Sequence, residues 1–143
     1  NEATLTATRG DAERIGPRDF DAAYEKIVLG DPREGKLHPE EKRRVAVHES
    51  GHAIAAHFGP YSEPLRRVSI LPRGMALGIT QQSPQEDRHI QTQPELESRL
   101  AVLLGGFAAE RLVLGNVSSG SANDLKQANN LPDRSTLRIS IGC

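Results

Sequence analysis

Apolar residues recur with helical spacing in three long stretches of the chain. The first lies within residues 1–29, where a stripe spaced i, i+3, i+4, i+7, i+8 ends at Gly30. The second covers about 39–58, after a proline and two acidic residues that favour a helix start, and it ends before Gly59-Pro60. The third runs from about 93 to Leu114. This pattern predicts a mainly α-helical chain.

Shorter signals fill the gaps between these stretches. Thr92 and Glu95 have the spacing of a capping box at the start of the third helix. Residues 10–17 have the composition of a turn, so residues 1–8 are predicted to end an earlier helix. Residues 31–38 are polar and rich in breakers, which predicts a linker, and residues 123–128 resemble a further helical turn.

Two short runs favour β-structure, Val68-Ser69-Ile70-Leu71 and Leu77-Gly78-Ile79-Thr80, with Pro72-Arg73-Gly74 between them. The predicted fold class is therefore α+β, mainly α with a small β-hairpin or sheet. Because Gly74 and Gly78 leave one edge with little side-chain bulk, that edge could accept an extended peptide as an extra strand. An ordinary hairpin with glycine kinks agrees equally well with these residues.

Charge and composition exclude several classes of function. The 143 residues include 18 basic and 19 acidic side chains, for a formal net charge of −1, so no overall field favours nucleic acid or anionic lipid. The single cysteine excludes an internal disulfide and a cysteine-based zinc knuckle. No apolar run approaches the ~18 residues of a membrane span. The first residue is Asn1 rather than Met, so we expect part of a longer protein, with any membrane anchor upstream.

The second predicted helix carries H-E-x-x-H as His48-Glu49-Ser50-Gly51-His52. Histidines four apart leave the same helix face one turn apart, so their ring nitrogens can meet one tetrahedral zinc ion. Glu49 then falls beside the metal, where it can take a proton from zinc-activated water. Gly51 destabilises a helix by about 1 kcal/mol relative to Ala, which indicates close approach of another backbone. A pair of structural histidines is the alternative interpretation.

A catalytic zinc site needs a third protein ligand. His57 lies on the opposite face of the helix from His48, and His38 and His89 have polar, surface-like surroundings. A downstream carboxylate is therefore required, and the residues alone leave four candidates: Glu86, Asp87, Glu110 and Asp124. Glu110 lies on the apolar stripe of the third helix, where it could hold a zinc-bound imidazole, pair with an arginine or extend toward solvent.

Four ordered motifs closely resemble the protease domain of the FtsH family of zinc endopeptidases. They are the H-E-x-x-H segment, residues 68–78, Leu103-Leu104-Gly105-Gly106-Phe107-Ala108-Ala109-Glu110 and Ser119-Gly120-Ser121-Ala122-Asn123-Asp124-Leu125. Residues 1–30 resemble the end of the lid of an AAA+ ATPase module, so the predicted domains are 1–30 (lid end), 31–38 (linker), 39–131 (partial peptidase domain) and 132–143 (unmatched tail). In the FtsH family a long helix begins at the aspartate that corresponds to Asp124, and Pro132 interrupts that helix here.

The resemblance implies an ATP-dependent zinc metalloendopeptidase that cuts unfolded or membrane proteins. It implies His48, His52 and Asp124 as zinc ligands, Glu49 as the base, and Gly74, Met75, Ala76, Leu77 and Gly78 as the substrate-binding strand. It also implies a homo-hexamer anchored in a bacterial inner membrane, a mitochondrion or a chloroplast, while this chain has no phosphate loop, so ATP would bind outside it. The alternative is a truncated, non-catalytic fragment that binds zinc or partner subunits.

Overall fold

The computed structural model describes residues 1–31, 37–72, 77–83 and 90–131, which fall into two compact units. The first unit holds residues 1–31, 71–72 and 77, and the second holds 37–70, 78–83 and 90–131. The described chain is mainly helical with one small antiparallel sheet, which confirms the predicted fold class.

Two short helices make up the first unit. They are α1 (Glu2–Arg9) and α2 (Pro17–Leu29), with the predicted turn between them. Alanines on their facing sides are buried, and Lys26 of α2 forms an ion pair with Glu2 of α1. The Asp19 carboxylate accepts a hydrogen bond from the Gly16 N–H at 2.8 Å, which satisfies a free donor at the start of α2.

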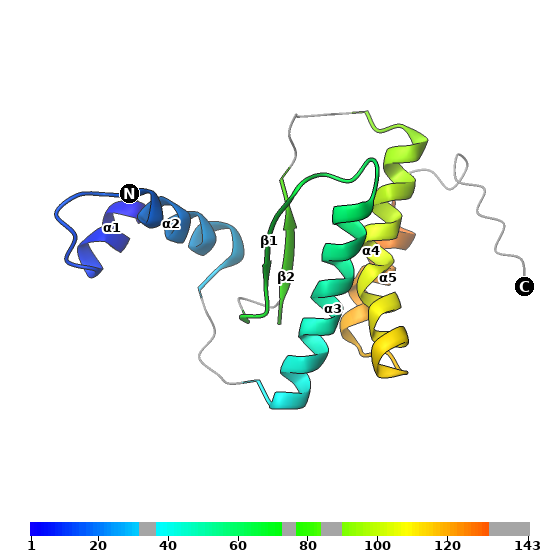
Figure 1. The fold of residues 1–143 in the computed structure, drawn as a ribbon. Helices are drawn as coiled ribbons and strands as arrows, with labels where there is room; N and C mark the ends of the chain where they lie inside the picture. Colours follow the sequence, from blue (N-terminus) through cyan, green and yellow to red (C-terminus); the bar gives the residue numbers. More distant parts are fainter. Residues whose placement is uncertain (32–36, 73–76, 84–89, 132–143) are drawn as a thin grey trace, which may run out of the picture. The chain divides into compact units, whose positions relative to one another are not determined.

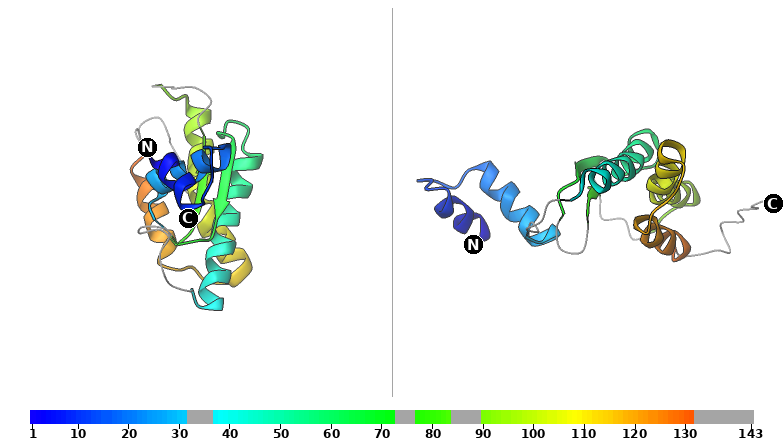
Figure 2. Two further views of the ribbon diagram at one scale, coloured as in Figure 1. Left: turned by 90° about the vertical axis from the view of Figure 1, so that its left-hand side faces the viewer. Right: turned by 90° about the horizontal axis from the view of Figure 1, so that it is seen from below.

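The second unit is arranged around α3 (Pro39–Phe58), which has the bounds that the sequence predicts. Its sheet, β1 (Leu65–Ser69) with β2 (Ile79–Gln82), contacts one side of α3. The antiparallel neighbour α4 (Gln93–Leu114) lies along the other side, and α5 (Gly120–Asn129) packs on α4 (Figure 1). The view along the helices shows the order sheet, α3, α4, with α5 beside α4 (Figure 2).

The predicted strand bounds are wrong by two to three residues, since the strands were expected at 68–71 and 77–80. Val68 pairs with Thr80 and Ser69 with Ile79, and pairing then continues through Arg67 and Gln81 to Leu65 and Gln82. A backbone ladder does not require apolar side chains, and an antiparallel sheet can leave one face in water. Apolar runs therefore marked the correct region but not its ends.

Glycines bring the backbones of α3 and α4 together. A Cβ on Gly51 would lie 2.2 Å from the Gly105 carbonyl oxygen, and one on Gly105 would lie 2.6 Å from the Gly51 oxygen. This contact confirms the close approach that Gly51 predicts. No larger residue fits at such a crossing without moving a backbone.

The buried side of α4 differs from the predicted apolar stripe. Its buried residues include Ser98, Val102, Gly106 and Glu110, each four positions after the last, together with Leu96. The remaining members of the predicted stripe are only half-buried: Leu100, Leu103, Leu104, Phe107 and Leu114. Small residues occupy the centre because the helices are too close there for leucine, and the larger side chains flank the contact.

The ends of α4 follow the local sequence signals. Glu95 Oε2 accepts hydrogen bonds from the Thr92 N–H at 2.6 Å and the Thr92 hydroxyl at 2.8 Å. Gly115 ends the helix with φ of 73°, a conformation that L-residues with a side chain rarely adopt. Within the described ranges, no helix is both long and apolar enough to cross a bilayer.

Replacing Gly51 by alanine should destabilise the second unit by about 1–3 kcal/mol, because the added methyl meets a backbone carbonyl that cannot turn away. Urea unfolding followed by circular dichroism measures the change. Ser50→Ala is the matched control, since Ser50 is the exposed neighbour on the same helix and its replacement should stay within about 0.5 kcal/mol. Equal stability of the two variants would contradict the close crossing.

Candidate metal centre

The two motif histidines project from α3 on one face, as their spacing predicts. Their ring centroids are 4.7 Å apart with an interplanar angle of 82°, and His48 Nε2 lies 3.1 Å from His52 Nε2. His52 is buried and His48 is half-buried. Both Nε2 atoms therefore face one small volume beside the helix.

Asp124 reaches this volume from α5. Its Oδ2 lies 3.0 Å from His48 Nε2 and 3.3 Å from His52 Nε2. The three residues thus place one ligand atom each within 4.8 Å of one another. Of the four carboxylates that the sequence left open, Glu86 and Asp87 lie outside the described residues, and Asp124 is the one that faces both Nε2 atoms.

Glu110 orients the ring of His48. Its Oε1 lies 2.8 Å from His48 Nδ1, and a carboxylate can only accept, so Nδ1 carries the hydrogen and the Nε2 lone pair is left free. Glu110 also pairs with an arginine, because its Oε2 accepts a hydrogen bond from Arg44 at 2.9 Å. The alternative that Glu110 extends toward solvent was wrong, since its side chain is fully buried. A carboxylate partner on the remote nitrogen of a metal-binding histidine fixes its tautomer and raises its basicity.

A backbone carbonyl orients the ring of His52 in the same way. His52 Nδ1 donates to the Val102 oxygen at 2.7 Å, which leaves Nε2 free. Between the two acceptors on α4, Gly106 lies directly against the rings: a Cβ there would come within 2.5 Å of His48 Cε1 and 2.6 Å of His52 Nε2. The rings are therefore confined between α4 and their own helix.

Full burial of Glu110 is compensated by several donors. Its side chain is 0% exposed, yet it accepts hydrogen bonds from the Ser118 N–H, the Ser118 hydroxyl and the Ser121 hydroxyl, as well as from Arg44. Burial alone would raise the pKa of Glu110, but the bonds from Arg44, Ser118 and His48 outweigh it and lower the pKa. Glu110 is thus held as a carboxylate.

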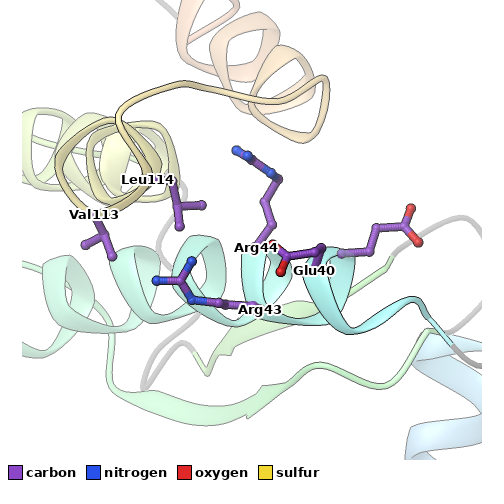
Figure 3. Close-up of a pocket in the computed structure, with 6 residues that line it drawn as sticks. Glu40, Arg43, Arg44, Val113 and Leu114 are labelled. Atoms are coloured by element: carbon purple, nitrogen blue, oxygen red, sulfur yellow. The ribbon is translucent and has the colours of Figure 1, made fainter.

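Arg44 connects this buried carboxylate to the surface. Its guanidinium also donates to the Asn116 side chain at 2.8 Å and to the Asn116 carbonyl at 3.3 Å. Figure 3 shows Arg44 extending from α3 toward the loop after α4, at the margin of a shallow groove that Val113 and Leu114 also line. None of the residues that line this groove belongs to the His48, His52 and Asp124 cluster.

The cluster has the chemistry of a cation site. Two imidazole lone pairs and a carboxylate oxygen face one another, and Asp124 Oδ2 is buried without a hydrogen-bond partner. Such atoms repel unless a proton or a metal ion lies between them. Bonds of about 2.0–2.2 Å to tetrahedral zinc place ligand atoms roughly 3.3 Å apart. The observed separations of 3.0, 3.1 and 3.3 Å are close to that value, so these residues fit zinc.

Glu49 is buried on the side of α3 that faces the sheet. Thr80 of β2 donates to Glu49 Oε2 at 2.7 Å, and its hydroxyl lies 3.1 Å from the Glu49 carbonyl oxygen. Gly78 packs against the same side chain, because a Cβ there would lie 2.7 Å from Glu49 Cγ, Glu49 Oε1 and Val45 Cγ1. The carboxylate is thus enclosed between α3 and β2.

Several predicted residues are not brought to the cluster or cannot be placed. His38 and His57 are exposed, and His89 lies outside the described residues. Of the predicted substrate-binding strand, Gly74, Met75 and Ala76 are outside the described residues, and Leu77 is grouped with the first unit. Gly78, which the structure describes, is placed against Glu49.

Sequence reasoning missed four contacts. Thr80 lies in a run that was assigned to the hairpin for its β-propensity alone, and Ser118 lies in a loop with no distinguishing pattern. Ser121 lies in the motif that contains Asp124, but nothing in that motif marked it as a partner of Glu110. The Val102 carbonyl leaves no trace in the sequence, because every residue has one. The consecutive glycines 105 and 106 within an apolar helix were the available signal for the close packing.

The ionisation states of the cluster are coupled to stability in the metal-free protein. Contact with Asp124 raises the pKa of His48, against the effect of burial. Burial lowers the pKa of His52, but contacts with Asp124 and the Val102 carbonyl outweigh it, so the net shift is upward. Burial would raise the pKa of Asp124, but His48 and His52 lower it from 3.8 to about 2. Each shift favours the ion pair between imidazolium and carboxylate.

Metal-free protein should therefore unfold at a lower temperature at pH 8 than at pH 6. A raised histidine pKa stabilises the fold fully below the unfolded value of about 6.5, and this contribution is lost as pH rises through the folded value. The Asp124 contribution to stability is present above the ordinary pKa of 3.8 and is lost only as pH falls toward about 2.

Calorimetry after chelation measures the unfolding temperature at the two pH values. Asp124→Asn should flatten the pH 6–8 slope, whereas His57→Gln, at an exposed site on α3, should leave it unchanged. A slope that survives Asp124→Asn would contradict the coupling.

Known proteins are similar to this chain over most of its length. An ATP-dependent zinc metalloprotease FtsH of Marinobacter nauticus is 45% identical over 131 residues, which are 92% of this chain and 21% of that protein. An ATP-dependent zinc metalloprotease FtsH 4 of Sphaerobacter thermophilus is 49% identical over 134 residues, 94% of this chain and 20% of that protein. The protein named ATP-dependent zinc metalloprotease FtsH in Acidimicrobium ferrooxidans is 50% identical over 127 residues, 88% of this chain and 19% of its own length.

This chain therefore spans about a fifth of the length of the curated relatives it matches. The model of one family, Peptidase family M41, matches residues 36–137, which includes the first residues of the tail that was predicted to be unmatched. The predicted domain boundaries themselves stay a prediction. The resemblance to the FtsH family is confirmed, and because the family match covers most of the chain, this protein belongs to peptidase family M41.

Proposed function

We propose that this chain carries the zinc-binding and catalytic residues of a metalloendopeptidase. His48, His52 and Asp124 hold the zinc ion, and Glu49 is the base. The observation that supports this assignment most is the convergence of His48 Nε2, His52 Nε2 and Asp124 Oδ2 within 3.3 Å, with Asp124 Oδ2 otherwise unpartnered. Membership of a peptidase family, and relatives named zinc metalloproteases, support the same reaction class.

A zinc ion held by these three residues would act as a Lewis acid toward a peptide carbonyl and would lower the pKa of a coordinated water toward about 7. Glu49 takes a proton from the attacking water and gives it to the leaving amine, so that one water is consumed for each bond cut. Oε1 is the oxygen suited to this transfer, because Oε2 accepts the Thr80 hydroxyl hydrogen. Glu110 and the Val102 carbonyl keep both imidazoles in the tautomer with Nε2 free.

The substrate is a polypeptide in an extended conformation. Residues 74–78 would pair with it as an added strand, and Gly78 against Glu49 brings the end of this segment next to the base. The relatives are named ATP-dependent zinc metalloproteases, which supports an ATP-driven peptidase role for the whole protein. What the FtsH resemblance implies in addition, unfolded or membrane polypeptides as substrates and a membrane-anchored homo-hexamer, is part of this proposal. Binding of zinc or partner subunits without turnover is the outcome that the experiments below would separate from catalysis.

Asp124→Ala should lower zinc affinity by more than the ~10–100-fold expected for losing an outer partner, because it removes a direct ligand. Competition with a chromophoric chelator measures the affinity. Glu97→Ala, an exposed carboxylate on α4, should bind zinc like the wild type. Glu110→Ala provides the critical comparison, since zinc retained in Asp124→Ala and lost in Glu110→Ala would make Glu110 the third ligand and contradict the proposal.

Glu49→Gln in the full-length protein should reduce kcat for casein cleavage by about 10²–10⁴-fold with zinc content near one per chain, because the amide cannot accept the proton. Metal analysis and initial rates measure the two quantities. Glu41→Gln, at an exposed position on the same helix, is the control and should cleave normally. A wild-type protein that binds zinc but cleaves nothing would favour the non-catalytic alternative.

A further inference from the structure

We propose that Thr80 is the residue that positions the carboxylate of Glu49. The inference rests on the proposed role of Glu49 as the base, and it adds a residue of the sheet to a site otherwise built from helices. Thr80 acts through Glu49 and is therefore a positioning residue.

The contact is short and has a charged acceptor. Thr80 Oγ1 lies 2.7 Å from Glu49 Oε2 and 3.1 Å from the Glu49 carbonyl oxygen. A hydroxyl has a single hydrogen to donate, and the shorter approach with the charged acceptor takes it. Glu49 Oε2 is thereby engaged, and Oε1 is left for the proton of the attacking water.

The donor itself is rigidly placed. Thr80 is β-branched, which restricts its χ1 angle, and its backbone pairs with Val68 in the two-stranded ladder. A glutamate side chain has several free torsions whose fixing is entropically unfavourable, so a fixed donor narrows the orientations of the carboxylate before substrate arrives.

Gly78 confines the same side chain from a second direction. The absence of a Cβ lets the backbone before β2 come against Glu49 Cγ and Oε1, where a methyl would stand 2.7 Å away. Backbone packing limits where the side chain can lie, and the Thr80 hydroxyl decides which oxygen turns toward the strand. Gly78 and Thr80 therefore constrain Glu49 in different ways. The Thr80 hydroxyl can be removed without changing the shape of that side chain, whereas any replacement of Gly78 adds atoms.

Thr80→Val removes the hydroxyl and keeps the volume, so it tests the hydrogen bond alone. In the full-length protein, kcat for casein should fall about 10–100-fold, the rate equivalent of losing one hydrogen bond to a charged group. KM and zinc content should not change, because neither the ligands nor the docking strand is altered. Thr80→Ser restores the donor and should recover most of kcat, and Thr4→Val, at an exposed threonine of α1, is the matched control.

A double-mutant cycle gives a readout that is independent of activity. Unfolding of metal-free wild type, Thr80→Val, Glu49→Gln and the double variant should be non-additive, because both single changes alter one contact. Additive effects, an unchanged kcat in Thr80→Val, or a Thr80→Ser variant as slow as Thr80→Val would each overturn the inference. If the wild type cleaves nothing, or Glu49→Gln remains active, the proposed function fails, while the cycle still decides whether Thr80 and Glu49 interact.

Discussion

Two helix backbones meet at one pair of glycines, and the geometry of the His48, His52 and Asp124 cluster depends on that contact. Gly51 of α3 and Gly105 of α4 leave no room for a side chain between them. Immediately after the crossing, Gly106 lies against both imidazoles. The Val102 carbonyl and the Glu110 carboxylate, one helical turn to either side of Gly106, accept the Nδ1 hydrogens of His52 and His48. One close crossing therefore orients both rings.

That orientation places acceptor atoms so close together that they repel one another unless a cation lies between them. With both Nδ1 atoms committed as donors, the Nε2 lone pairs turn toward Asp124, and the three atoms need a proton or a metal ion between them. Glu110 stays charged at full burial because Arg44 and two serines donate to it. Since Ser121 belongs to α5, the same carboxylate also ties down the helix that carries Asp124.

Helix α3 separates two environments. His48 and His52 face α4 and α5, whereas Glu49, one residue and about 100° further around the helix, turns toward β2. The sheet supplies the Thr80 hydroxyl and the bare backbone of Gly78 on that side. Small as it is, the sheet encloses the Glu49 side chain on that side.

The sequence by itself determined the local features: the bounds of α3, the shared face of His48 and His52, the Glu95 contact with Thr92 and the need for close approach at Gly51. Each depends on residues within a few helical turns, where chain geometry fixes the spacing. The strand ends, the buried side of α4 and the contacts of Thr80 and Ser118 were decided by tertiary structure. From the residues alone, Glu110 and Asp124 were two of four carboxylates left open as the third ligand. Their separate positions depend on how α4 packs against α3 and how α5 packs on α4, which local periodicity does not encode.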